Sequence, residues 1–154
     1  RVARRSLDHL EPPFEVRGQV QTDGRTSRIV LGMDFSGRPR AAMLFEQLDG
    51  TPRIRFSRVD MQVDVDAGRA IPLYTIFAGY ELPEGNNINF HLYVKKGEEE
   101  SYFTANGTDS IALGLDDLQP WRLKGALGLG CEDDTVALWT GLEIRPNRPF
   151  WPVP

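Results

Sequence analysis

The sequence predicts one all-β domain, a two-sheet antiparallel β-sandwich of the jelly-roll type with little or no helix. Three observations lead to this fold class. Apolar and polar residues alternate with a period of two along most of the chain. Turn-forming residues recur about every 8–12 residues, and no apolar pattern of helical period persists for three turns. Parallel α/β folds need crossover helices and are therefore disfavoured, whereas a closed barrel is the alternative.

The first half of the chain divides into alternating segments that turns separate. Asp23-Gly24 and Asp49-Gly50 are typical of hairpin turns. The segments expected as strands are 14–21, 27–35, 41–48, 53–59, 61–65 and 73–82. In the second of these, one face would carry Ile29, Leu31, Met33 and Phe35.

The second half continues the same pattern. Expected strands are 88–95, 101–105, 110–113, 124–130 and 135–145, with one helical turn or a loop at 116–120. In the last strand, Val136 and Leu138 are expected to face the core, which would turn Trp139 outward. Residues 1–12 are expected to form an N-terminal arm, 13–146 the sandwich, and 147–154 a proline-rich tail.

Length and charge limit the classes of protein to consider. The 154 residues suit one domain, and the formal net charge of −4 lacks the basic excess typical of nucleic-acid binders. No apolar run approaches the roughly 18 residues of a membrane-spanning helix, so membrane insertion is not expected. The chain begins with Arg1 rather than Met, which indicates a processed protein or part of a longer one. Cys131 is the single cysteine and is interpreted as a small hydrophobic residue.

Two stretches of the second half carry strand motifs. Residues 102–107 read Tyr-Phe-Thr-Ala-Asn-Gly, a strand followed by a hairpin dipeptide. Residues 123–130 contain Gly-Ala-Leu-Gly-Leu, and 136–146 form an alternating strand that ends in Ile-Arg-Pro. The glycines allow the strand to curve, as a jelly roll requires. These motifs resemble those of the concanavalin A-like lectin/glucanase superfamily, which includes laminin G-like domains.

The resemblance implies a sandwich that binds glycans, binds proteins or hydrolyses β-glucans. The glucanases of this superfamily carry a Glu-x-Asp-x-(x)-Glu cluster, and the nearest segment here, 60–66, departs from it. The leading hypothesis is therefore a non-catalytic carbohydrate-binding or accessory domain of a larger protein, with a polysaccharide or glycan as partner. An extracytoplasmic location would accompany that role. The alternatives are a structural or protein-interaction domain and a glycan-active hydrolase.

One set of aromatic and polar residues has the chemistry of a sugar-binding face. Sugar rings present C–H groups that stack on aromatic rings, and their hydroxyls need hydrogen-bonding side chains. The candidate ligand-binding residues are Asn89, His91, Tyr93, Tyr102 and Trp139. The alternative is that the two sheets bury these rings, or that the proline-rich tail covers Trp139.

A second set of residues carries carboxylates. Asp60, Asp64 and Asp66 lie at even spacing, which would place them on one strand face. Asp64 and Asp66 are weak calcium candidates, because calcium prefers several oxygen ligands. The alternative is an acidic strand edge that discourages aggregation. No other cofactor is expected, and His91 has no second histidine near it in the sequence to complete a metal site.

Overall fold

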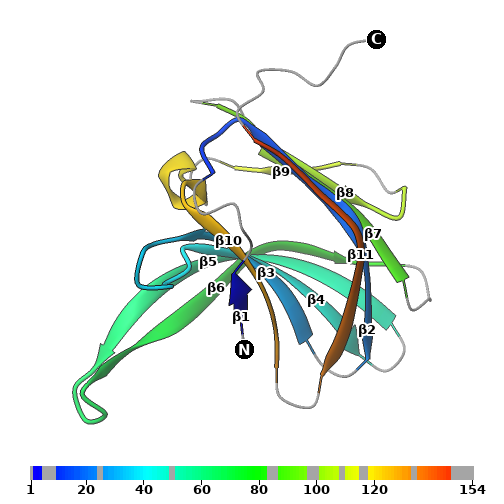
Figure 1. The fold of residues 1–154 in the computed structure, drawn as a ribbon. Coiled ribbons are helices and arrows are strands. Elements are labelled where there is room, and N and C mark those ends of the chain that lie inside the picture. The colour runs from blue at the N-terminus through cyan, green and yellow to red at the C-terminus, as the bar shows by residue number, and fades with distance from the viewer. Residues whose placement is uncertain are drawn as a thin grey trace.

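The computed structural model describes residues 2–4, 10–23, 26–48, 51–82, 87–96, 101–107, 110–114, 118–132 and 135–146. These residues form two stacked antiparallel sheets (Figure 1), which confirms the predicted all-β sandwich. The six-stranded sheet has the order β1 (Val2–Arg4), β10 (Ala126–Cys131), β3 (Thr26–Met33), β4 (Ala41–Leu48), β5 (Thr51–Asp64), β6 (Arg69–Glu81). The five-stranded sheet has the order β11 (Val136–Pro146), β2 (Phe14–Asp23), β7 (Asn87–Val94), β8 (Ser101–Ala105), β9 (Ile111–Leu113). A short 3-10 helix, η1 (Pro120–Leu123), precedes β10.

The hydrophobic core lies between the two sheets. Cross-strand partners share a face, so Ile29, Met43 and Phe56 form one inward row on neighbouring strands, and each is 0% exposed. Phe45 on β4 contacts Phe90 on β7, with ring centroids 5.0 Å apart, and thereby joins the sheets. Burial of each such side chain stabilises the fold by about 1.5–3 kcal/mol. The described residues contain no helix with the length and apolar character that a bilayer crossing requires.

The expected strands 53–59 and 61–65 are one continuous strand. β5 runs for 14 residues and pairs with the 13-residue β6, and their hairpin extends away from the rest of the molecule (Figure 1). No glycine or proline lies between residues 53 and 65, so nothing breaks the strand between the two segments. The chain reverses instead at 65–68, where Gly68 has a φ of +64°.

Met33 does not share the inward face of Ile29 and Leu31 but packs with Val30 in a separate cluster. Phe35 does not share that face either, which corrects the expectation from the spacing. It is 100% exposed and follows the end of the strand at Met33. The alternation breaks at Gly32, where φ is +63° and the register between β3 and β10 shifts. A Cβ at this position would lie 1.9 Å from the carbonyl oxygen of Arg122, so only glycine allows η1 to approach β3 here.

The residues expected as an N-terminal arm contribute to the sandwich. Val2–Arg4 pair with β10 as an edge strand, and Leu10 is 1% exposed within the core. The tail at 147–154 lies outside the described residues.

The expected phase of β11 is wrong. Trp139 pairs with Val20, which is 0% exposed, so the indole faces the core rather than solvent. There it meets Phe45 and Phe90 edge-on, at centroid distances of 5.6 and 6.3 Å. Leu138 is 58% exposed instead. Both phases of this strand are apolar. The indole of Trp139 takes the inward position because the rings of Phe45 and Phe90 pack against it there.

Substitution in β11 tests this register. Trp139→Ala should lower the free energy of unfolding by about 3 kcal/mol, because a large ring leaves a packed site. Leu138→Ala, one residue away on the outer face, should change it by less than about 0.5 kcal/mol. Urea denaturation of both variants measures the difference. The reverse order of effects would show that the assigned phase of β11 is mistaken.

Candidate functional site

The outer face of the five-stranded sheet carries three rows of polar side chains, which we call the polar face. Each row follows cross-strand partners, whose side chains point to the same side of a sheet. The rows are Thr140, Gln19 and Asn89; Glu143, Arg17 and His91; and Arg145, Glu15, Tyr93 and Tyr102. The alternation that sends Val16, Val20, Ile88 and Phe90 into the core therefore brings these polar residues together.

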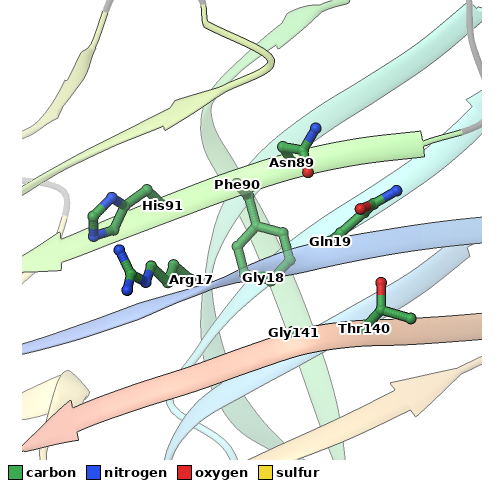
Figure 2. Close-up of a pocket in the computed structure, with 8 residues that line it drawn as sticks. All are labelled: Arg17, Gly18, Gln19, Asn89, Phe90, His91, Thr140 and Gly141. Carbon is green, nitrogen blue, oxygen red and sulfur yellow. The ribbon is translucent and has the colours of Figure 1, made fainter.

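A hollow of about 470 Å³ lies in the polar face. Figure 2 shows Arg17 and His91 at one end and Gln19, Asn89 and Thr140 toward the other. Gly18, Phe90 and Gly141 complete its lining. The hollow is open to solvent, as a site for an extended ligand would be.

Two glycines explain why β11 leaves this space. The register between β11 and β2 shifts between Thr140 and Glu143, and Gly141 has a φ of +60° within that bulge. Nothing lies within 4 Å of the place where a Cβ of Gly141 would stand. At Gly18 a Cβ would come within 3.2 Å of the Leu142 Cα, so glycine lets β11 pack closely beneath the hollow. Bulges of this kind re-aim side chains beside binding sites.

Three side chains of the hollow are available to a ligand. Within the described part of the chain, the structure records no hydrogen bond to the side chain of Gln19, Asn89 or Thr140. The two amides each offer a carbonyl acceptor and an NH₂ donor, and the hydroxyl offers both roles. Adjacent donors and acceptors of this type match ligands with neighbouring hydroxyl groups.

Arg17 is held in place by a carboxylate on the next strand. Its Nε and Nη2 donate to the Glu143 Oε2 at 3.0 and 2.7 Å. These hydrogen bonds lower the pKa of Glu143 and raise the pKa of Arg17. The carboxylate of Glu143 thus orients the guanidinium of Arg17.

His91 is paired with Glu15. The His91 Nε2 lies 2.7 Å from the Glu15 Oε1. Burial nevertheless lowers the pKa of His91 below its ordinary value of 6.5, against the opposing hydrogen bond from Glu15. This shift favours the neutral form of the ring at pH 7. Because a carboxylate can only accept, the proton sits on Nε2, and Nδ1 is left as an acceptor.

The rings of the polar face form a continuous stack. His91 lies 3.9 Å from Tyr93, and Tyr93 lies 4.7 Å from Tyr102, with interplanar angles of 28° and 29°. Partial burial within the stack raises the pKa of Tyr93. Lys95 places its Nζ 5.7 Å from the centroid of Tyr102. The ring of His91, stacked on Tyr93, forms one side of the hollow.

The structure thus gathers four of the five sequence-predicted residues, Asn89, His91, Tyr93 and Tyr102, on one face. Trp139 lies on the opposite side of the same sheet, within the core. Sequence reasoning missed Arg17, Gln19 and Glu15, although they occupy the polar phase of the strand at 14–21. It also missed Thr140 and Glu143, because only the bulge in β11 reveals which of its residues face outward.

Asp60, Asp64 and Asp66 do not share the one strand face that their spacing predicts. Asp66 lies in the turn beyond β5, so it does not share a strand face with Asp60 and Asp64. The Asp64 Oδ1 accepts backbone N–H groups of Asp66 and Ala67 at 3.1 and 3.2 Å, and the Asp60 Oδ1 pairs with Arg122 at 3.0 Å. The described residues hold no group of three or more metal-ligating side chains. Calcium binding at Asp64 and Asp66 stays a prediction.

Solved structures of the same architecture include animal lectins. A toad ovary galectin in complex with thio-digalactose has a TM-score of 0.53 and 12% identity, over 94% of this chain and 97% of that one. Human galectin-16 has a TM-score of 0.51 and 9% identity, over 96% and 94%. The chain has the concanavalin A-like lectin fold.

An enzyme of similar architecture is an alginate lyase from Pseudomonas aeruginosa, with a TM-score of 0.50 and 12% identity. The alignment covers 88% of this chain but only 65% of the lyase. No protein-family model matches the chain, and no curated protein matches its sequence. At these identities the likeness concerns the fold.

The lowered pKa of His91 predicts a pH dependence. The unfolded chain takes up the proton at a higher pH than the folded protein does, so the free energy of unfolding should decrease as pH falls below about 6.5. An NMR titration of the ring C–H signals, assigned with His91→Gln, should give a midpoint below 6.5. Glu15→Gln should lower it further, because the carboxylate favours the charged ring. A midpoint above 6.5 would contradict the dominance of burial.

Proposed function

We propose that the polar face of the five-stranded sheet is a non-catalytic glycan-binding surface. The observation that carries this proposal is the hollow beside the His91–Tyr93–Tyr102 stack. It combines an aromatic wall with three polar side chains, Gln19, Asn89 and Thr140, that have no hydrogen-bonding partner within the described residues. Binding sites typically pair such an apolar wall with a few convergent polar groups.

A sugar ring in the hollow would use both kinds of group. Its C–H face packs against the ring of His91, whose orientation the neighbouring Tyr93 fixes. Neighbouring hydroxyls meet the amides of Asn89 and Gln19, which are cross-strand partners. Nδ1 of the neutral His91 accepts one further hydroxyl. Because the hollow is open at the surface of a sheet, a polysaccharide can lie across it without a chain end.

The fold supports a glycan ligand without identifying one. A galectin of the same fold was solved with thio-digalactose. At a sequence identity of 12%, no sugar-binding residue of that galectin can be assigned to a residue of this chain. The proposal for this chain therefore rests on the chemistry of the polar face, and the ligand is defined only as a polyhydroxylated chain.

The carboxylates of the polar face favour binding over hydrolysis. Glycoside hydrolysis needs a carboxylic acid that keeps its proton near neutral pH, beside a second free carboxylate. Here Arg17 lowers the pKa of Glu143, and one oxygen of Glu15, Oε1, is paired with His91. Shortening of the polymer during incubation with the protein would replace this proposal with an enzymatic one.

Titration of neutral polysaccharides into the protein tests the proposal. Asn89→Ala should weaken binding about threefold to tenfold, since one or two hydrogen bonds are lost. The double variant Gln19→Ala/Asn89→Ala should bring binding below detection in calorimetry. Asn87→Ala is the matched control, because Asn87 is exposed on the same strand but outside the hollow.

Two outcomes would count against a glycan site in this place. The first is the absence of binding across a broad polysaccharide panel by a protein whose thermal unfolding is cooperative. The second is equal weakening by Asn87→Ala and Asn89→Ala, which would locate the ligand elsewhere.

A further inference from the structure

A second hollow, of about 310 Å³, lies on the outer face of the six-stranded sheet. Its lining includes Arg28, Leu44, Arg55, Tyr74, Ile76 and Glu132. The core separates this hollow from the polar face, because the two sheets stack with their outer faces on opposite sides (Figure 1). Whatever it binds is therefore independent of the proposed glycan surface.

The floor of this second hollow is apolar. Leu44 belongs to a cluster with Val30, Ala42 and Val59, which is distinct from the core between the sheets. Leu44 is only 7% exposed, and Tyr74 packs against the cluster. A ligand here would rest on aliphatic carbon beside an aromatic ring, so it needs an apolar surface of its own.

Arg28 brings a positive charge to the second hollow. Its Nη1 donates to the Tyr74 hydroxyl at 3.0 Å, which orients the guanidinium. Its Nε has no hydrogen-bonding partner, and no ion pair of Arg28 is recorded within the described residues. A partly buried guanidinium of this kind is stabilised by an anion.

Arg55 adds to the charge from the other side of Leu44. Arg28, Leu44 and Arg55 are cross-strand partners in one row, so the two arginines flank the leucine. The Arg55 Nε donates to Glu46, and Arg53 reaches the same carboxylate at 3.3 Å. Two guanidiniums thus share one buried carboxylate, which leaves one positive charge in excess beside that of Arg28.

We propose that this second hollow binds a compact ligand that carries a carboxylate on a ring. The carboxylate accepts hydrogen bonds from Arg28 and Arg55, whose planar guanidiniums match its geometry. The ring of the ligand lies on Leu44 and against Tyr74 and Ile76. A uronic acid and an aromatic acid both have this chemistry, and the experiment distinguishes them.

Glu132 allows a specific test of the proposal, because its carboxylate should weaken the binding of an anionic ligand. Its backbone N–H donates to the Thr26 carbonyl at 3.0 Å, which holds the residue at the rim, and its side chain is exposed. A carboxylate at the rim repels an anionic ligand. Removal of this charge should therefore strengthen binding, an effect that structural damage does not produce.

The test is titration of the intact chain with sodium glucuronate and with sodium benzoate, followed by NMR or calorimetry. Glucose and benzyl alcohol serve as uncharged counterparts. We expect one or both acids to bind, the uncharged compounds to bind at least about 10-fold more weakly, and affinity to fall as salt is added. Glucuronate alone would define a sugar acid, and benzoate alone an aromatic acid.

Three variants locate the site. Arg28→Gln should weaken binding about 10-fold or more, and Glu132→Gln should strengthen it about twofold to fivefold. Arg69→Gln, at an exposed position on β6 that lines neither hollow, should leave it unchanged. Arg28 is preferred to Arg55 because loss of Arg55 would leave buried Glu46 with one partner fewer. Thermal melts verify that each variant folds.

The proposal is overturned if neither acid binds more tightly than about 10 mM, or if glucose binds as well as glucuronate. It is also overturned if folded Arg28→Gln binds like the parent protein. Asn89→Ala should not affect binding of either acid, so failure here and failure of the glycan proposal give different results.

Discussion

The packing of aromatic rings between the sheets is the contact on which the rest of the structure depends. Phe45 from one sheet meets Phe90 and Trp139 from the other, and these contacts hold the layers face to face. Once those rings point inward, the period of two forces their neighbours on the same strands outward. The polar face follows from this arrangement. Phe90 and Leu92 on β7 point into the core, so His91 between them points to the outer face.

This dependence explains which parts of the fold can be predicted from sequence. Alternation in 14–21 and 88–95 has one apolar and one polar phase, so both the strand and its orientation are evident. In β11 both phases are apolar, so spacing alone cannot choose between Leu138 and Trp139. The exposure of Phe35 could not be predicted from the sequence either, because it depends on how closely η1 approaches Gly32.

The site was predictable only where its residues share a strand or a hairpin. Asn89, His91 and Tyr93 come from β7, and Tyr102 follows on β8 through a local connection. Arg17 and Glu143 are 126 residues apart in sequence, and only the pairing of β11 with β2 makes them neighbours. Such distant pairings carry no local signal, so the anchor of Arg17 becomes visible only in three dimensions.

The long β5–β6 hairpin has a consequence for how the molecule can change. Among the described residues, β4 pairs with β5 only as far as Arg58, so the outer part of the hairpin is a ribbon of two strands. A two-stranded ribbon gains little stability by itself. Its tip at 65–68 is remote from both layers of the core, and inserted peptide there would displace no buried side chain. The tip is thus a natural attachment point for a label, a tether or a second polypeptide.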